Sequence, residues 1–404
     1  MWTRARRSFL LPAVLLLTTA VTGCALGVTP GVSVTAFEHN FDGHLIETFV
    51  GAAADFSPQH QVVAVTCGDV EFRDAVTGKR TGISPHWSGI LSAPMEWVRF
   101  SPDGDLVLAA SGFSGFSNSV RVWLVGDRDP IYEIEWEREE LALAQWAPLG
   151  FFLPDSRRVA VNQGPTVRFY DARSGIPVDS IPTHLPEVNH IAISNSGDVM
   201  AVGSAFVNLI EVYDLTMNTL VDSVRFDFAD LSVGESWDEA SVYVNQLIFS
   251  PDDTKLLAGV EFARNSDDVW RRTLVYDRRG LTVEKTLPGG SFVAFAPDAR
   301  HMALFRNGYQ VTQHPRTGET RVIDATSVQI LTYPETKEVV VFPAPRSLRW
   351  IGWVADNALW TVRGEPQTYG GWLGGMVRRE FDFALISASD TLPPPSPVRE
   401  VSFH

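Results

Sequence analysis

Cysteine is scarce in this chain, whose 404 residues include only Cys24 and Cys67. No C-x-x-C pair is present, so the sequence lacks the spacing typical of structural zinc sites and thioredoxin-like redox sites. The H-E-x-x-H motif of zinc peptidases and the G-x-S-x-G motif of serine hydrolases are absent too. We therefore expect no catalytic residues, no metal site and no cofactor. A metal site at His184 and His190 is the less favoured alternative to solvated loop histidines.

Basic residues are also few, at 33 Lys and Arg against 48 Asp and Glu, which gives a formal net charge of −15. A surface of this sign repels the phosphate backbone of nucleic acids, so a nucleic-acid partner is excluded. The 45% share of apolar residues is enough for a sizeable core and argues against a disordered chain.

The N-terminus is typical of an export signal. Arg4, Arg6 and Arg7 precede an apolar run that is too short and wrongly flanked for a membrane-spanning helix. The run ends in "VTGC", which resembles a bacterial lipobox, the motif in which the cysteine becomes a diacylated first residue. We therefore predict that residues 1–23 are a signal peptide and that Cys24 is lipidated.

Cleavage before Cys24 removes three arginines and no acid, so the net charge moves from −15 to −18. Several acyl chains hold a protein on a membrane far more firmly than one. We expect an extracytoplasmic protein tethered in the cell envelope, on either the inner or the outer membrane. Cys67, in the apolar segment "VVAVTCGDV", is then left without a disulfide partner and is interpreted as a small core residue.

One hairpin pattern recurs six times at intervals near forty to fifty residues. It has an apolar strand, a turn rich in Pro, Asp, Ser or Gly, a second apolar strand, and a later strand that in most copies closes on an aromatic or basic residue followed by Asp. The copies begin "FSPQHQVVAV" at 56, "FSPDGDLVLAA" at 100, "FLPDSRRVAV" at 152, "AISNSGDVMAV" at 192, "FSPDDTKLLAG" at 249 and "FAPDARHMALF" at 295. This interval is the size of one four-stranded propeller blade.

Physical chemistry explains the repetition. Both faces of these strands are apolar, as in "QVVAV", so a single sheet cannot cover its own surfaces. Stacking such sheets around an axis buries both faces and leaves only short edges.

These repeats resemble WD40 and the related YVTN-type propeller repeats. The resemblance rests on "FSPDG", "VRVWLV" and on pairs that close the third strand of a repeat, and it covers most of residues 40–390. We predict that the structural repeat positions include the closing aspartates Asp74, Asp171, Asp214 and Asp277.

The sequence also departs from the WD40 pattern. The Gly-His dipeptide of WD40 blades occurs once, at Gly43 and His44, and the second copy has Trp123 and Leu124 where an Asp is expected. We therefore favour a bacterial WD40-like or YVTN-like propeller and transfer no binding residues from the family.

We predict an all-β fold, a single propeller over residues 41–390 with seven four-stranded blades, eight being the alternative. The segment "HLIETFV" at 44–50 is expected to supply the outer strand of the last blade and so close the ring. Residues 24–40 are a predicted linker, and the Pro-rich tail 391–404 is either a linker or a strap.

Two features are candidates for binding. The tryptophans of the last predicted blade are dense enough for an aromatic binding surface, with blade core as the alternative for Trp353 and Trp360: Trp350, Trp353, Trp360 and Trp372. Acidic insertions at 133–140 and 226–241 lengthen loops, which carry function more often than strands do.

The favoured function is a lipid-anchored, monomeric interaction or scaffold module whose partner is an unidentified protein or envelope polymer. The alternatives are an extracytoplasmic propeller enzyme of the lactonase or hydrolase kind, with its site in the central channel, and a small-ligand or sugar sensor. Fold alone does not choose among them.

Overall fold

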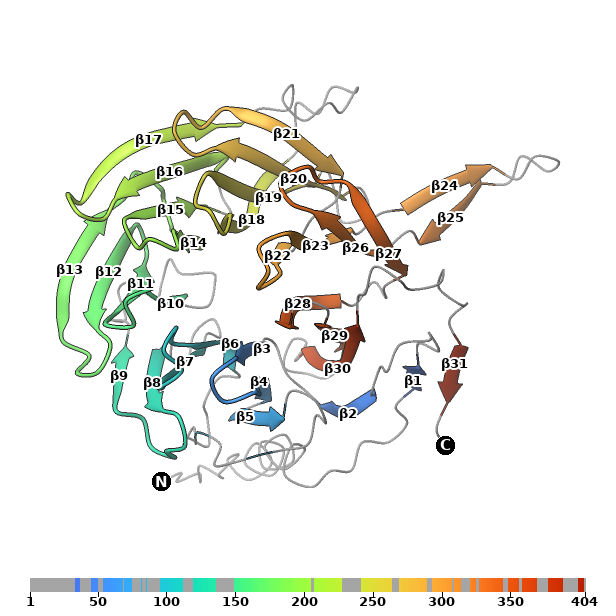
Figure 1. Cartoon of the computed structure of the whole chain (residues 1–404), viewed down its shortest axis with the longest axis horizontal. Coiled ribbons are helices and arrows are strands. Elements are labelled where there is room, and N and C mark those ends of the chain that lie inside the picture. Colours follow the sequence, from blue (N-terminus) through green and yellow to red (C-terminus); the bar gives the residue numbers. More distant parts are fainter. Residues whose placement is uncertain are drawn as a thin grey trace, which may run out of the picture.

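The computed structural model is a ring of β-sheets around a central axis (Figure 1). It describes residues 33–36, 45–49, 54–67, 69–74, 81, 85, 95–111, 119–135, 149–204, 207–226, 241–263, 269–288, 293–306, 309–313, 320–324, 327–343, 348–355, 358–368, 377–387 and 399–402, some of them by their backbone only. Every element in these residues is a strand. No helix long and apolar enough to cross a membrane occurs among them.

The sheets are numbered here along the chain. Sheet 1 contains β3 (Ala54–Ser57), β4 (Val62–Cys67) and β5 (Asp69–Asp74). Sheet 2 contains β6 (Met95–Phe100), β7 (Leu106–Ser111), β8 (Ser119–Leu124) and β9 (Tyr132–Glu135). Sheet 3 contains β10 (Gly150–Phe152), β11 (Arg158–Gln163), β12 (Thr166–Asp171) and β13 (Pro177–Pro182).

Sheet 4 contains β14 (His190–Ile193), β15 (Val199–Gly203), β16 (Leu209–Asp214) and β17 (Thr219–Arg225). Sheet 5 contains β18 (Ser241–Phe249), β19 (Lys255–Ala263), β20 (Val269–Asp277) and β21 (Val283–Pro288). Sheet 6 contains β22 (Val293–Phe295), β23 (His301–Arg306), β26 (Ser327–Thr332) and β27 (Glu338–Pro343).

Sheet 7 is assembled from both ends of the propeller segment. It contains β28 (Leu348–Ala355), β29 (Ala358–Thr368) and β30 (Val377–Ser387), and β2 (Leu45–Phe49) pairs with β30 as its outer strand. Leu45 lies opposite Ala384 and Ile46 opposite Phe383 in an antiparallel register. The predicted N-terminal closing strand is therefore confirmed.

The predicted count of seven four-stranded blades is wrong. Six sheets, sheets 2 to 7, have four strands, whereas sheet 1 has three in the part of the chain that the structure describes. The amide of Thr81 donates a hydrogen bond of 2.9 Å to the carbonyl oxygen of Phe72 on β5, where a fourth strand would bond. The ring thus contains six complete blades and one three-stranded sheet between sheets 7 and 2.

Sheet 6 differs from the predicted blade because a hairpin is inserted into it. β24 (Tyr309–Gln313) and β25 (Thr320–Asp324) pair only with each other and project from the ring (Figure 1). The third strand of sheet 6 is β26, which pairs with β23. The segments "SVQILTY" and "KEVVVFPA", which begin at 327 and 337, therefore belong to sheet 6 and not to the last blade. A separate pair joins β1 (Ser33–Ala36) to β31 (Arg399–Ser402).

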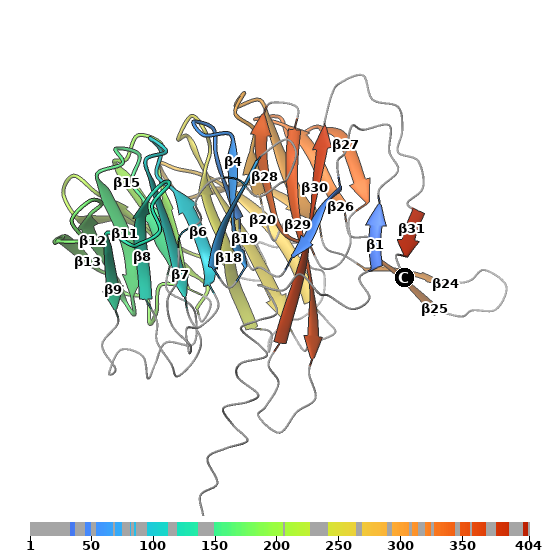
Figure 2. The same ribbon diagram turned by 90° about the horizontal axis from the view of Figure 1, so that it is seen from below.

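The core lies between neighbouring sheets. Along β15, Val199 and Ala201 pack in a cluster shared with sheet 5, whereas Met200 and Val202 pack in a cluster shared with sheet 3. Successive side chains point to opposite faces of a strand, so an apolar strand serves two interfaces at once. Similar clusters join sheets 1 and 2, 2 and 3, and 5 and 6. Seen edge-on, the strands cross the thickness of the ring (Figure 2).

Candidate functional site

Strands alternate in direction within each sheet, so the turn after the first strand and the turn after the third strand lie on the same side of the ring. We call this side the turn face. Its first turns are residues 58–61, 102–105, 154–157, 195–198, 251–254 and 297–300, and its second turns are residues 125–131, 172–176, 215–218, 278–282 and 333–337.

A buried serine organises the first turns of sheets 2, 4 and 5. In sheet 2 the Ser101 hydroxyl oxygen accepts a hydrogen bond of 2.9 Å from the Leu106 amide and donates one of 2.5 Å to Asp103. The same pair of bonds occurs at Ser194 with Asp198 and at Ser250 with Asp252. This explains the repeated Ser and Asp of the sequence pattern, since a serine hydroxyl can donate and accept at once.

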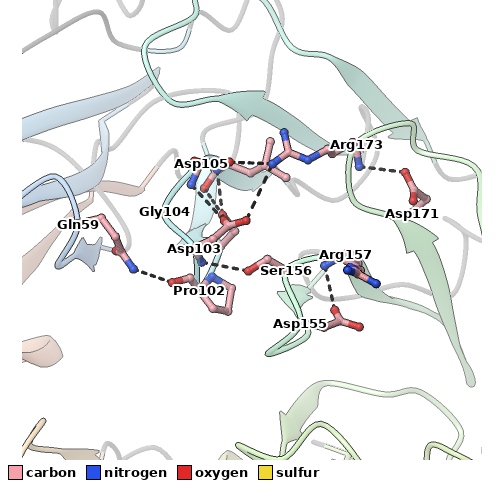
Figure 3. Close-up of polar contacts among 12 residues, drawn as sticks. Gln59, Pro102, Asp103, Gly104, Asp105, Asp155, Ser156, Arg157, Asp171 and Arg173 are labelled. Carbon is pink, nitrogen blue, oxygen red and sulfur yellow. Dashed lines mark hydrogen bonds and ion pairs between the residues drawn. The ribbon is translucent and has the colours of Figure 1, made fainter.

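The turns of sheets 1, 2 and 3 are bonded to one another (Figure 3). Gln59 Nε2 donates to the Pro102 carbonyl oxygen at 2.7 Å, and the Asp103 amide donates to Ser156 Oγ at 3.0 Å. The second turn of sheet 3 joins them, because Arg173 Nη2 lies 2.7 Å from Asp105 Oδ2.

The turns of sheets 4, 5 and 6 repeat this linkage. The amides of Asn195 and Ser196 donate to the carboxylate of Asp253 at 2.7 and 2.8 Å. The Tyr333 hydroxyl in the second turn of sheet 6 donates to Asp252 at 3.1 Å. Bonds between backbone-fixed turns oppose movement of one sheet against the next. Within sheets 1 to 3 and within sheets 4 to 6, the turn face is therefore a rigid polar surface.

The closing aspartates of the repeat are the last residues of the third strands, Asp74 on β5, Asp171 on β12, Asp214 on β16 and Asp277 on β20. Asp171 accepts from the hydroxyl and amide of Ser174 at 2.8 Å each, and Asp214 accepts from Thr216 in the same way at 2.6 and 2.7 Å. These bonds hold the pKa of both carboxyls below the usual value. Asp171, Asp214 and Asp277 thus lie at the strand ends that border the turn face, and Asp74 ends the third strand of sheet 1 in the same way.

The inner strands carry a second polar feature. Asp55, Arg99 and Phe151 occupy the same repeat position in sheets 1, 2 and 3, directly before Phe56, Phe100 and Phe152. In sheets 4, 5 and 6 this position holds Ala192, Ile248 and Ala294. The only charged residues at this position in sheets 1 to 6 are therefore the adjacent Asp55 and Arg99.

The contacts of this pair are unusual. Asp55 Oδ2 accepts a hydrogen bond of 2.7 Å from the Phe100 amide, and burial raises the pKa of its carboxyl. Asp55 Oδ1 lies 3.8 Å from Arg99 Nη1, too far for a hydrogen bond, and the two side chains are 24% and 28% exposed. The Arg99 guanidinium carbon lies 5.4 Å from the ring centroid of Trp97 and 5.9 Å from that of Phe151.

Of the four candidate tryptophans, Trp353 has a described side chain. It is only 7% exposed, and its indole nitrogen donates to the Ala294 carbonyl oxygen at 3.0 Å. Trp353 is therefore a residue of the blade core, which was the alternative to a binding role, and its bonded indole is usual for a buried tryptophan. Trp350 and Trp360 lie on β28 and β29, with their side chains outside the described residues, and Trp372 lies outside them altogether.

The remaining predicted residues fall in several places. Cys24 and most of the insertions 133–140 and 226–241 lie outside the described residues, as does the side chain of Cys67 at the end of β4. His184 Nδ1 lies 2.9 Å from Glu211 Oε1, and His190 is on β14. No group of three or more His, Cys, Asp or Glu side chains that could hold a metal occurs among the residues with described positions.

Sequence reasoning did not select Arg99, Asp55 or Trp97. The available signal was their place in the repeat, since charged residues precede the repeated phenylalanine in the first two copies and an apolar residue precedes it in the third. Only the ring geometry brings these positions together.

Comparison with known proteins identifies the fold. No family model matches the chain, and no curated protein matches it. Among solved structures, the β-propeller domain of Cps50 (Swd1) from Myceliophteria thermophila is similar, with a TM-score of 0.57 and 13% sequence identity. The match covers 86% of this chain and 100% of that domain. The chain therefore has a WD40-like β-propeller fold.

Proposed function

We propose that this protein is a lipid-anchored extracytoplasmic propeller that acts as a protein interaction or scaffold module at the cell envelope. The lipobox-like segment before Cys24 supports the anchor, and the WD40-like fold, common among interaction scaffolds, supports the module. The proposed partner is a protein or an envelope polymer. The propeller itself acts as a monomer.

The observation that carries this proposal is the bonded turn face. Asp253 accepts bonds from the first turn of sheet 4, and Ser156 accepts one from the first turn of sheet 2, so neighbouring turns are fixed relative to each other. A surface fixed before binding loses little conformational freedom on binding, which favours affinity for a partner of matching shape.

Two other functions have some support. An enzyme with its site in the central channel would need convergent polar groups on inner strands, and Asp55 with Arg99 is a pair of that kind. A sugar sensor would rest on Trp350, Trp360 and Trp372. The interaction module is favoured because the bonded turn face extends over several sheets.

The anchor is tested by replacing the cysteine that would carry the lipid. The Cys24→Ser variant is expected to leave the membrane fraction, because it cannot be acylated, whereas Cys67→Ser is expected to stay in that fraction. Quantitative blotting of membrane and soluble fractions measures both. A Cys24→Ser protein that remains with the membrane would show that the lipobox interpretation is wrong.

The interaction is tested by cross-linking the tagged protein in intact membranes, purifying the complexes and identifying their components by mass spectrometry. One partner in fixed proportion is expected. Shortening the insertion 133–140 or 226–241 is expected to reduce its recovery if these loops form part of the binding face. A protein that is recovered alone under every cross-linking condition would contradict the module and favour the enzyme or the sensor.

A further inference from the structure

We propose that Arg99 binds the carboxylate of a small organic ligand at the inner rim of the ring, next to the turn face. Trp97 and Phe151 hold the Arg99 guanidinium, and the Asp55 carboxylate competes with the ligand for it. The inference concerns the inner strands of sheets 1 to 3 and does not depend on the lipid anchor or on the partner proposed above.

Arg99 has unused hydrogen-bond donors. An arginine guanidinium carries five N–H donors, and within the described residues Arg99 makes no hydrogen bond, only the ion contact of 3.8 Å to Asp55. Other arginines in the structure are differently placed. Arg271 lies 2.7 Å from Glu261 and Arg121 lies 2.9 Å from Glu133. Arg99 is therefore free to bind a further acceptor.

The Arg99 guanidinium is held in place by two aromatic rings. Its carbon lies 5.4 and 5.9 Å from the ring centroids of Trp97 and Phe151, whose rings are 6.3 Å apart. Contact with aromatic rings favours the cation and limits its rotation. A planar, restrained guanidinium matches the two oxygens of a carboxylate, with which it can form two parallel hydrogen bonds.

The charges around Arg99 select among anionic ligands. Asp55 Oδ2 accepts a hydrogen bond from the Phe100 amide, and its Oδ1 faces Arg99 at 3.8 Å, too far for a hydrogen bond to the guanidinium. Asp55 and the net charge of −15 repel any anion, but they repel a ligand with one negative charge less than a doubly charged phosphate. The site therefore favours a carboxylate over a phosphate.

Calorimetric titration of the full-length protein with benzoate tests the proposal. Benzoate is expected to bind, whereas benzamide, an uncharged compound of similar shape, and inorganic phosphate are expected to bind at least about tenfold more weakly. Arg99→Met is expected to weaken benzoate binding by about tenfold or more. Arg99→Lys keeps the charge but loses the paired donors, so its affinity is expected to fall between those of the wild type and Arg99→Met. Arg225→Met, at the exposed end of the outer strand β17, is the control and is expected to bind as the wild type does.

The Asp55→Asn variant is expected to gain affinity, which misfolding of the variant could not produce. Its amide oxygen still accepts from the Phe100 amide, but the competing charge is gone, so benzoate is expected to bind several-fold more tightly. Asp155→Asn, in an exposed turn of sheet 3, removes the same charge elsewhere and is expected to leave affinity unchanged. Absence of benzoate binding, equal binding of benzamide or phosphate, or unchanged affinity in both Arg99→Met and Asp55→Asn would overturn the proposal.

Discussion

The half-buried imidazole of His190 lies on the inner strand of sheet 4, and desolvation lowers its pKa from 6.5 to about 4. The folded protein therefore binds fewer protons at this site than the unfolded chain between these two pH values. The resulting stabilisation is present above pH 6.5 and is lost as the pH falls toward 4. The free energy of unfolding of the wild-type protein is thus expected to decrease as the pH is lowered from 6.5 to 4.

Replacement by glutamine isolates this contribution. Gln246 occupies the position of His190 in sheet 5, where its amide bonds both the amide and the carbonyl group of Val293, so glutamine fits an inner strand of this ring. The His190→Gln variant is expected to show a shallower fall in the free energy of unfolding between pH 6.5 and 4. Urea unfolding at several pH values measures it. An unchanged slope would show that His190 is not the group responsible.

Residue positions differed in how well the sequence predicted them. Asp171, Asp214 and Asp277 were predicted as repeat positions because each follows an aromatic residue at the end of an apolar strand, and the structure places each at a strand end. The roles of Arg99 and Trp353 depend on neighbours in other sheets, to which a local pattern gives no access.

At the scale of elements, the first turns share one strained backbone position. Its φ is 79° at Gly104 and 77° at Gly197, and it stays positive at Ala299, with 57°. Glycine adopts a positive φ readily, whereas a residue with a Cβ is destabilised there by about 1 kcal/mol. Glycine is therefore expected to be the best residue at this position wherever no side-chain bond is lost.

Substitutions in both directions test this expectation. Ala299→Gly is expected to raise the free energy of unfolding by up to about 1 kcal/mol, and Gly197→Ala to lower it by about 1 kcal/mol. Gly104→Ala is expected to cost more, because its Cβ would lie 3.0 Å from atoms of Gln59, whereas at Gly197 the nearest atom is 3.5 Å away. Equal effects of Gly104→Ala and Gly197→Ala in chemical unfolding would contradict the contact argument.

The sequence predicted the strands well where the repeat is regular. Both faces of β15 and β19 are apolar, and these strands lie where the pattern places them. The prediction was wrong in sheet 6, because β24 (YQVTQ) and β25 (TRVID) contain β-branched residues and follow β23 directly, where the third blade strand is expected. They are separate from the blade because β26, which follows them in the sequence, pairs with β23 in their place. A local sequence pattern does not reveal such a pairing between distant segments.

At the scale of the whole molecule, the ring is closed by pairing strands from the two ends of the propeller segment. Deletion of residues 34–50 removes β2 and leaves the outer edge of β30 unpaired. An exposed strand edge promotes association between chains. The deleted protein is expected to aggregate and to lose its cooperative unfolding transition, as measured by light scattering and circular dichroism. A monomeric, cooperatively unfolding deletion would count against this role of β2.

The predicted number of complete blades was too high because of sheet 1. Sheet 1 begins with the same hairpin as the other sheets, so the sequence pattern predicts a complete blade there. Its β3, β4 and β5 follow that pattern, but a fourth strand is represented in the described residues by the single bond from Thr81 to Phe72. Outer strands have weaker patterns because most of their side chains are exposed, as on β13 and β17.

The account depends most on closure of the ring, because a rigid turn face needs every sheet to be held between two neighbours. Ile46 lies opposite Phe383, whereas Ala384 faces the other side of β30. In a chain with Cys24→Ser and Cys67→Ser, the pair Ile46→Cys and Phe383→Cys is expected to form a disulfide under mild oxidation. The pair Ile46→Cys and Ala384→Cys is expected to remain reduced, as read by non-reducing electrophoresis and mass spectrometry. A disulfide in neither pair, or in both equally, would contradict the closed ring.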